Sequence, residues 1–304
     1  MEKVLVLLST FNGEKYLEAQ IQSLLAQDYQ NLGILIRDDG STDGTKLILQ
    51  NFEKQFPKRI QVEYGKNVGY RNSFFRLMET VPTDCSFYAF CDQDDYWLPQ
   101  KISKAISTLQ SMNQKRPLYY CSRLTIVDKD LKVTGYSDIP RQPADFRQYF
   151  FSSIPTGSTT VFNDELRRIA LAGRELARNH DSWMLLVASF FGEIFVDHDS
   201  FILYRQHGSN TLGLELNFWR KSADKLCRIL RKDVKFNNIS AFAGLFLQQY
   251  SQLMSDEQKT FVSMVAGYRQ SLRQTLRLAL SPEIRTSNWY DTLAVRFLVL
   301  LQYI

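Results

Sequence analysis

The chain of 304 residues carries a net charge of +5 at pH 7, and 44% of its residues are hydrophobic and 23% charged. This composition predicts an ordinary globular protein, built as one large domain or as a domain of about 200 residues with an extension. Fourteen glycines and eight prolines are too few for a collagen-like or low-complexity chain, and the aromatic share of 13% is too high for a disordered one.

Positive charge is concentrated in the C-terminal third of the chain. Residues 215–304 contain 13 Lys and Arg against 7 Asp and Glu, whereas residues 1–214 contain 24 against 25. The basic surplus favours an anionic partner, such as a membrane surface or a phosphorylated acceptor. The nearly neutral first part argues against nucleic acid as a partner.

Cysteine spacing and apolar runs bear on the cellular compartment. The four cysteines, Cys85, Cys91, Cys121 and Cys227, form no C-x-x-C pair. We therefore interpret them as reduced thiols of a cytosolic protein. The apolar run at residues 4–8 is too short for a signal peptide, and no uninterrupted run reaches the roughly 18 residues of a membrane span.

Strands and helices alternate through the first half of the sequence. Short apolar runs predict strands at residues 4–8, 34–36, 60–64 and 87–91, as is typical of parallel strands buried on both faces. Helical spacing predicts helices after each strand, the second capped by Ser41 or Thr42 and the fourth beginning near Pro99. The alternation predicts a doubly wound α/β sheet, in which ligands bind at the carboxyl ends of the strands.

Beyond residue 113 the alternation weakens. We expect strands at 118–127 and 156–162, a helix at 181–191, and extended segments at 194–196 and 201–204. From residue 215 onward the pattern is helical. Val265, Tyr268, Leu272 and Leu276 are expected to share one helix face.

Polar clusters follow the four predicted strands at residues 9–13, 38–43, 66–69 and 92–95. Because the carboxyl ends of parallel strands meet at one edge of a sheet, these clusters should converge on one rim. The first cluster lacks the glycines of a dinucleotide-binding loop, and the chain has no P-loop pattern. A dehydrogenase and the common kinases are therefore disfavoured.

Asp92, Asp94 and Asp95 place three carboxylates within four residues. Two such charges about 5 Å apart, at an effective dielectric constant near 20, repel by roughly 3 kcal/mol. Magnesium or manganese that bridges carboxylate and phosphate oxygens would relieve this repulsion. The alternative is a solvated acidic turn that caps the helix after Pro99.

Several motifs together resemble the family 2 glycosyltransferases with a GT-A fold. They are T-F-N-G at residues 10–13, D-D-G-S-T-D-G-T at 38–45, N-V-G at 67–69 and D-Q-D-D-Y-W-L-P-Q-K at 92–101. The last is most similar to the bacterial rhamnosyltransferase-like branch, which builds cell-wall and capsular polysaccharides. Residues 157–162, 180–183 and 204–210 are similar to later motifs of that branch. The resemblance covers about residues 1–213.

The resemblance implies a site for a nucleotide-sugar donor. Its expected residues are Thr10, Phe11, Asn12, Asp38, Asp39, Asn67, Arg71, Asp92 and Asp95. Asp39 would accept a hydrogen bond from the imide nitrogen of a pyrimidine base. Thr10 and Phe11 would line the same base pocket, and Phe11 stands where the family usually has tyrosine. The alternative role of Asp38 is to support the backbone of its loop. The alternative for Arg71 is an ordinary surface arginine.

The resemblance further implies a divalent metal, Mg or Mn, held by Asp94 and His207. Asp92 would bind the ribose or order its loop, and Asp95 would orient the donor sugar. His207 as a solvated loop residue is the competing interpretation. Asp181 is the candidate catalytic base; it stands just before an apolar helix, so its alternative role is an N-cap, and His180 is the rival base.

We therefore expect a GT-A domain at residues 1–213 and a helical region at 214–304 for membrane association or dimerisation. The expected reaction is an inverting transfer, with dTDP-rhamnose as favoured donor and a lipid-linked glycan as acceptor, at the cytoplasmic face of the cell membrane. Seven basic residues could bind this surface: Arg220, Lys221, Lys225, Arg228, Arg231, Lys232 and Lys235. The alternative is that they form an ordinary solvated helix face. A UDP-hexose donor, a sugar nucleotidyltransferase and a non-catalytic scaffold are the alternatives.

Overall fold

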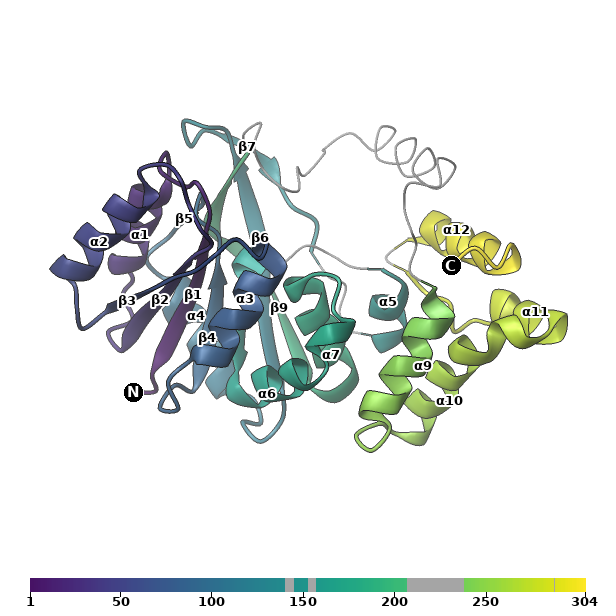
Figure 1. The fold of residues 1–304 in the computed structure, drawn as a ribbon. Helices are drawn as coiled ribbons and strands as arrows, with labels where there is room; N and C mark the ends of the chain where they lie inside the picture. Colours follow the sequence, from purple (N-terminus) through teal and green to yellow (C-terminus); the bar gives the residue numbers. More distant parts are fainter. Residues whose placement is uncertain (140–144, 153–156, 207–237, 287) are drawn as a thin grey trace. The chain divides into compact units, whose positions relative to one another are not determined.

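The computed structural model describes residues 1–139, 145–152, 157–206, 238–286 and 288–304 (Figure 1). The chain divides into two compact units. The first comprises Met1–Ala144 with Ile154–Gln206, and the second comprises Asp145–Ser153 with His207–Ile304. A boundary at residues 213 and 214 stays a prediction, because residues 207–237 lie outside the described part.

The first half of unit 1 is a parallel α/β layer. Its elements are β1 (Val4–Thr10), α1 (Leu17–Leu25), β2 (Leu32–Asp38), α2 (Thr45–Gln55), β3 (Ile60–Tyr64), α3 (Tyr70–Thr80) and β4 (Phe87–Cys91). β1 pairs in parallel with both β2 and β4, and β2 pairs in parallel with β3. All four predicted strands and the helices between them are confirmed.

The second half of unit 1 makes the sheet mixed. It contains β5 (Tyr96–Trp97), α4 (Lys101–Gln110), β6 (Leu118–Val127), β7 (Val133–Tyr136), β8 (Val161–Asn163), α6 (Asp164–Ala172), α7 (His180–Phe191) and β9 (Glu193–Arg205), with 3₁₀ turns η1 (Gly157–Thr159) and η2 (Arg174–Leu176). The strand order is β3-β2-β1-β4-β8-β6-β9-β5, with β7 beside β6. β8 runs antiparallel to β4 and β6, while β6 and β9 are parallel.

Helices cover both faces of this sheet, as Figure 1 shows. α3, α6 and α7 lie on one face, and α1, α2 and α4 lie on the other. The central strands are almost entirely shielded from water; Val4, Val6, Leu7 and Leu8 of β1 are each 0% exposed. Burial on both faces explains why these strands read as continuous apolar runs. The predicted doubly wound α/β layer is confirmed.

The two extended segments expected after α7 are confirmed as parts of one strand, β9. Two other local predictions in unit 1 are wrong. The expected strand at 156–162 is a 3₁₀ turn followed by the short strand β8. Neither Ser41 nor Thr42 caps α2, whose N-cap residue is Gly44. Instead, the Ser41 hydroxyl accepts a hydrogen bond from the backbone N–H of Asn12 at 2.9 Å, and so ties together the loops after β1 and β2.

Unit 2 is helical in its described residues. It contains α5 (Phe146–Phe151), α9 (Ile239–Tyr250), α10 (Asp256–Gly267), the 3₁₀ turn η3 (Tyr268–Gln270), α11 (Leu272–Leu280) and α12 (Trp289–Leu300). Phe150 of α5 packs on Phe242, Phe246 and Phe261, with ring centroids 5.4–5.9 Å apart. Aromatic packing therefore joins an internal helix of the chain to the C-terminal helices.

The predicted helix face at residues 265–276 is wrong. α10 ends at Gly267, and α11 starts afresh at Ser271, whose hydroxyl accepts a hydrogen bond from the backbone N–H of Gln274 at 3.3 Å. Val265 and Tyr268 are buried, whereas Leu272 and Leu276 are exposed. A serine cap after a 3₁₀ turn resets the helical phase, so one continuous periodicity does not apply.

The remaining expectations concern cysteines and membrane spans. Cys85, Cys91 and Cys121 are buried free thiols, and Cys227 and the seven basic residues at 220–235 lie outside the described residues. Over the ranges that the structure describes, none of the helices combines the length and the apolar character needed to cross a bilayer.

Candidate active site

Strand register brings the polar clusters to one edge of the sheet. Thr10 at the end of β1 pairs with Asp38 at the end of β2, and Leu8 pairs with Cys91 at the end of β4. The backbone N–H of Asp39 donates to the Thr10 carbonyl at 2.8 Å. The clusters after β1, β2 and β4 therefore converge, as parallel strands require.

Asp38 and Asp39 are both buried, with 0% and 2% of their surface exposed. The Asp38 carboxylate accepts from the backbone N–H of Ser41 at 3.2–3.3 Å, which is the backbone support that was its alternative role. The Asp39 carboxylate pairs with the Arg37 guanidinium at 2.9 Å and accepts the backbone N–H groups of Val68 and Gly69 at 2.9–3.1 Å. Asp39 therefore holds the loop at 67–69 against β2.

Gln93 links the loop after β1 to the loop after β4. Its Oε1 accepts from the Thr10 hydroxyl at 2.6 Å and from the Phe11 backbone N–H at 2.8 Å. Phe11 itself is 44% exposed, and Asn12 adopts a positive φ of 50° while its Oδ1 accepts the Thr42 backbone N–H at 2.9 Å. Gln93 was not among the predicted site residues, although its place between Asp92 and Asp94 was a signal for it.

A side chain at position 13 would collide with this link. A Cβ on Gly13 would lie 2.5 Å from Gln93 Oε1 and 2.7 Å from the Thr10 hydroxyl. The glycine of the T-F-N-G motif therefore permits the close approach of the two loops.

The acidic loop after β4 concentrates negative charge. Burial, together with the nearby charges of Asp94 and Asp181, raises the pKa of Asp92 to about 7. Burial, with the charges of Asp94 and Asp92, raises the pKa of Asp95 well above its usual range. Asp92 and Asp94 are half-buried, and Asp95 is fully buried. The crowding expected from the sequence is present.

Arg205, at the end of β9, closes this loop from the other side. Its backbone N–H donates to Asp95 Oδ1 at 3.4 Å, and its Nε donates to the Asp94 carbonyl at 3.1 Å. The same guanidinium lies over the Tyr16 ring, 4.6 Å from the centroid. Arg205 lies near the start of the later motif at 204–210, and the structure brings this arginine to the acidic loop. Arg205 is therefore a positioning residue that was not among the predicted site residues.

Lys101 lies buried beneath the same loop. Its Nζ is 3.6 Å from the centroid of the Trp97 ring and has no hydrogen-bond partner among the described residues. Burial lowers its pKa to about 7, although Cys91 and Asp95 act in the opposite direction. The second half of the D-Q-D-D-Y-W-L-P-Q-K motif therefore places a buried lysine against an aromatic ring and within electrostatic reach of Asp95.

Asp181 and His180 begin α7 but have different surroundings. Asp181 is half-buried in the first turn, and its Oδ1 accepts the Ser182 backbone N–H at 2.7 Å. The N-cap is Asn179, so the alternative role of Asp181 as an N-cap is wrong. A Cβ built on Gly157 would lie 3.3 Å from Asp181 Cβ, so the glycine keeps space beside this carboxylate.

His180 is enclosed by aromatic rings. It stacks on Phe74 at a centroid distance of 3.9 Å and meets Phe90 edge-on at 4.8 Å. Burial lowers its pKa to about 4, with Asp181 acting in the opposite direction. His180 is therefore a neutral packing residue near pH 7, and the enclosure and low basicity of its ring weaken its candidacy as the catalytic base.

Arg71 and Asn67 lie at the beginning of α3. The Arg71 Nε donates to the Ala177 carbonyl, and its Nη2 donates to the Arg174 carbonyl, both at 2.8 Å. Asn67 is exposed, and its Oδ1 accepts the Gly69 backbone N–H at 3.0 Å. A pocket of about 170 Å³ beside α3 includes Arg71 but none of the carboxylates at the strand ends. In this geometry Arg71 holds the segment that leads to α7.

The donor set of the acidic loop fits a hard divalent cation. Asp95 Oδ2 is buried and has no hydrogen-bond partner among the described residues, and burial, together with the nearby charges of Asp94 and Asp181, raises the pKa of Asp92. Within the described part of the chain, no three His, Cys, Asp or Glu side chains form a group able to hold a metal ion by themselves. His207 lies outside the described residues. Magnesium commonly uses one or two carboxylates with water and substrate phosphates, so a smaller protein set suffices.

The burial of His180 predicts a specific contribution to acid sensitivity. Its folded pKa of about 4 is below the ordinary 6.5, so the unfolded chain takes up this proton first as pH falls. The contribution is fully present above pH 6.5 and is lost between pH 6.5 and 4. We expect the free energy of unfolding of wild type to fall about 3 kcal/mol further over this interval than that of His180→Phe, because one pKa unit corresponds to about 1.4 kcal/mol.

Urea denaturation at several pH values measures this difference. His198→Gln is the matched control, because His198 is exposed, and it should retain the pH dependence of the wild type. Identical curves for wild type and His180→Phe would contradict the buried neutral state of His180.

Comparison with solved structures places this fold among known enzymes. The structure of S. aureus TarS 1-349 in complex with UDP matches with a TM-score of 0.54 at 15% identity, over 99% of this chain and 88% of that chain. Mannosyltransferase PcManGT from Pyrobaculum calidifontis, in complex with GDP-Man and Mn²⁺, matches with a TM-score of 0.50 at 16% identity, over 98% and 86%. The predicted GT-A fold class is confirmed.

Sequence comparison identifies the family. The chain is 28% identical over 262 residues to dTDP-rhamnosyl transferase RfbG of Shigella flexneri, covering 76% of this chain and 87% of the relative. It is 27% identical over 254 residues to the GalNAc(5)-diNAcBac-PP-undecaprenol beta-1,3-glucosyltransferase of Campylobacter jejuni, covering 78% and 77%. Residues 5–213, more than half of the chain, match the family described as Glycosyl transferase family 2. The chain therefore belongs to glycosyl transferase family 2.

Proposed function

We propose that this glycosyltransferase moves one sugar, with inversion, from a nucleotide-sugar donor to a hydroxyl of a lipid-linked glycan, and that dTDP-rhamnose is the donor. The observation that carries the proposal is the convergence of the polar loops at the carboxyl ends of β1, β2 and β4. Burial there, together with the nearby charges of Asp94 and Asp181, raises the pKa of Asp92. The choice of rhamnose is supported by the Shigella flexneri relative, whose name specifies a dTDP-rhamnosyl transferase.

Asp181 is the base in this proposal. Its carboxylate takes the proton of the acceptor hydroxyl while that oxygen attacks the anomeric carbon and the bond to the nucleoside diphosphate breaks. A single displacement inverts the anomeric configuration. The N-terminal turn of α7 interacts favourably with a negative side chain, and Gly157 places no side chain against this carboxylate.

Asp94, together with His207, would hold the divalent metal, Mg or Mn. When bound, such an ion would supply positive charge that offsets the negative charge of the departing diphosphate. The Mn²⁺ in the Pyrobaculum calidifontis structure supports the expectation of a metal. Arg205 restrains the backbone of Asp94 and so sets the position of this carboxylate.

The nucleotide would lie along the loops after β1, β2 and β3. We retain the predicted binding residues for it: Thr10, Phe11, Asn12, Asp38, Asp39, Asn67, Arg71, Asp92 and Asp95. Phe11 offers an exposed ring for a base. Asp39 has an additional role, since its contacts with the Val68 and Gly69 amides shape the loop that the nucleotide would meet.

The proposed acceptor implies work at the cytoplasmic face of a membrane. The Campylobacter jejuni relative is named for a substrate carried on undecaprenol, and the C-terminal third of this chain is basic. A peripheral location would bring the enzyme to such a substrate.

A UDP-hexose is the second candidate donor, because the Campylobacter jejuni relative is a glucosyltransferase of similar coverage. Calorimetry with dTDP-rhamnose and UDP-glucose, each with Mn²⁺, separates the two candidates. We expect binding of dTDP-rhamnose at least about tenfold tighter than binding of UDP-glucose, since a few specific contacts supply such a ratio. Preference for UDP-glucose would overturn the rhamnose assignment, and absence of binding to either would contradict the donor class.

Asp94→Asn should abolish metal-dependent release of nucleoside diphosphate, with a loss of at least about 100-fold, because a neutral amide binds a hard cation weakly. The assay follows nucleoside diphosphate as Mn²⁺ is titrated. Asp84→Asn, an exposed carboxylate near the other end of β4, is the control and should behave as wild type. Unchanged Mn²⁺ dependence in Asp94→Asn would remove this residue from the metal site.

Asp181→Asn should bind donor normally but lose about 100- to 10,000-fold in transfer, because only the proton acceptor is removed. Donor binding is measured by calorimetry and transfer by product formation. His180→Phe should keep most of the transfer activity, since its ring is buried among Phe74 and Phe90. Near-normal turnover of Asp181→Asn would show that the base is another residue.

A further inference from the structure

The described residues after α10 form a helical pair with two different faces. Gln302 Nε2 donates to the Thr275 hydroxyl at 3.0 Å, and Arg296 Nη2 donates to the Ser281 carbonyl at 3.0 Å. The later residue on the α12 side, Gln302, meets the earlier residue on the α11 side, Thr275, so α11 and α12 pack antiparallel. Leu278, Ala279, Leu298 and Val299 are buried.

The other face of each helix carries an exposed apolar stripe. Leu272, Leu276 and Leu280 recur every four residues along α11, and Trp289, Leu293 and Phe297 do so along α12, so each set shares one side of its helix. Their exposed fractions are 42–75%. We call these six residues the α11–α12 apolar stripes.

Such stripes differ from ordinary exposed hydrophobic residues. Single exposed leucines are common on soluble proteins, but large apolar side chains at helical spacing on a solvent-facing side reverse the usual pattern of a surface helix. Contiguous exposed apolar surface marks a site of interaction with a protein or a membrane.

Positive charge borders the stripes. Residues 268–304 contain five arginines against two acidic residues, Glu283 and Asp291. Arg273 and Arg277 each follow a stripe leucine by one position, about 100° around the helix, and are exposed. Neither makes an ion pair or hydrogen bond within the residues that the structure describes.

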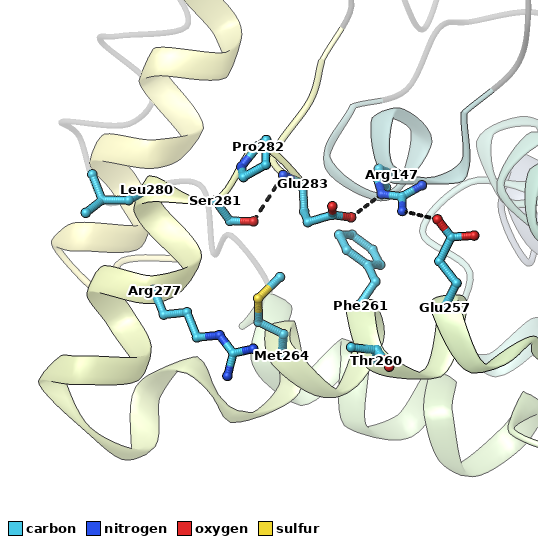
Figure 2. A pocket seen from close by; sticks show the side chains of 10 residues that line it. All are labelled: Arg147, Glu257, Thr260, Phe261, Met264, Arg277, Leu280, Ser281, Pro282 and Glu283. Carbon is cyan, nitrogen blue, oxygen red and sulfur yellow. Dashed lines mark hydrogen bonds and ion pairs between the residues drawn. The ribbon is translucent and has the colours of Figure 1, made fainter.

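A pocket beside α11 shows the contrast between compensated and uncompensated arginines. The pocket, of about 550 Å³, is lined by residues of α5, α10, α11 and the turn after α11. Figure 2 shows the Arg147 guanidinium between the carboxylates of Glu283 and Glu257, whereas the Arg277 side chain extends beside Met264. The charge of Arg147 is balanced internally, while that of Arg277 remains available to an external anion.

We propose that the α11–α12 apolar stripes dock on an anionic lipid bilayer. Helices with an apolar face, arginines along its edge and a tryptophan at one end are typical of segments that lie in the membrane interface. A second copy of the chain fits less well, because a twofold contact would bring the arginine-rich faces together without a matching acidic set. The biological purpose rests on the proposed lipid-linked acceptor, since docking would bring the enzyme to it.

The test is co-sedimentation of the full-length protein with vesicles, in the absence of any sugar nucleotide. One set of vesicles is phosphatidylcholine mixed with phosphatidylglycerol, and the other is phosphatidylcholine alone. We expect wild type to bind the anionic vesicles at least about tenfold more tightly, because each surface cation contributes about fivefold near anionic lipid. The combined variant Leu272→Gln/Leu276→Gln/Phe297→Gln should lose at least about tenfold.

Two further variants sharpen the experiment. Arg273→Gln/Arg277→Gln should weaken binding to anionic vesicles by about 25-fold and leave binding to neutral vesicles unchanged. Leu245→Gln/Leu253→Gln removes two other exposed leucines of unit 2 and should bind as wild type. Circular dichroism checks that all variants keep their helical content, which is expected because the changed side chains are exposed.

Vesicle binding by the triple variant equal to that of wild type would overturn the proposal, and so would a wild type that ignores anionic vesicles. Sedimentation velocity without lipid tests the competing occupant. A wild-type dimer that the triple variant converts to monomers, without vesicle binding by either form, would assign the stripes to a protein interface instead. Because these assays contain no donor, their outcome is independent of whether the proposed sugar transfer is correct.

Discussion

The site depends on the confinement of three carboxylates at the end of a buried strand. β4 is shielded from water along its length, and the chain emerges from it directly into Asp92, Asp94 and Asp95. Burial and mutual repulsion raise the pKa values of Asp92 and Asp95, so the fold disfavours the charged forms of carboxyl groups that an isolated peptide would leave in water. A loop under this repulsion needs restraint from its neighbours, and the surrounding contacts supply it.

Most of that restraint comes from polar side chains that bind backbone groups of other loops. Gln93 joins the acidic loop to β1, Asp39 holds the loop at 67–69, and Arg205 holds the acidic loop from β9. Each link spans at least 29 positions in sequence, so the loops are ordered by the completed sheet rather than by local turns. Residues expected to contact ligand therefore also shape the site, and Asp38 and Asp39 are the clearest examples.

Unit 2 follows different physical rules. Its interior is built from aromatic contacts among α5, α9 and α10, whereas α11 and α12 leave large apolar side chains in water beside uncompensated arginines. The two units suit different partners. The polar loops of the sheet suit a nucleotide, and the exposed apolar and basic surface of the helical unit suits a membrane interface. This division agrees with the charge asymmetry of the chain, in which the basic surplus belongs to the C-terminal third.

The α/β layer and the family could be predicted from the sequence, because buried parallel strands appear as continuous apolar runs and the motifs occur in order at their ends. The sequence also selected the acidic cluster and Asp181. Only the tertiary structure revealed that Gln93 and Arg205 fasten the loops, that His180 is enclosed by aromatic rings, and that Asn179 rather than Asp181 is the N-cap of α7. Those roles depend on which distant residues meet. The break before α11 has a similar consequence, because Leu272 and Leu276, predicted on one face with Val265 and Tyr268, are exposed instead. Periodicity reports local geometry, whereas burial and partners are set by contacts far apart in the chain.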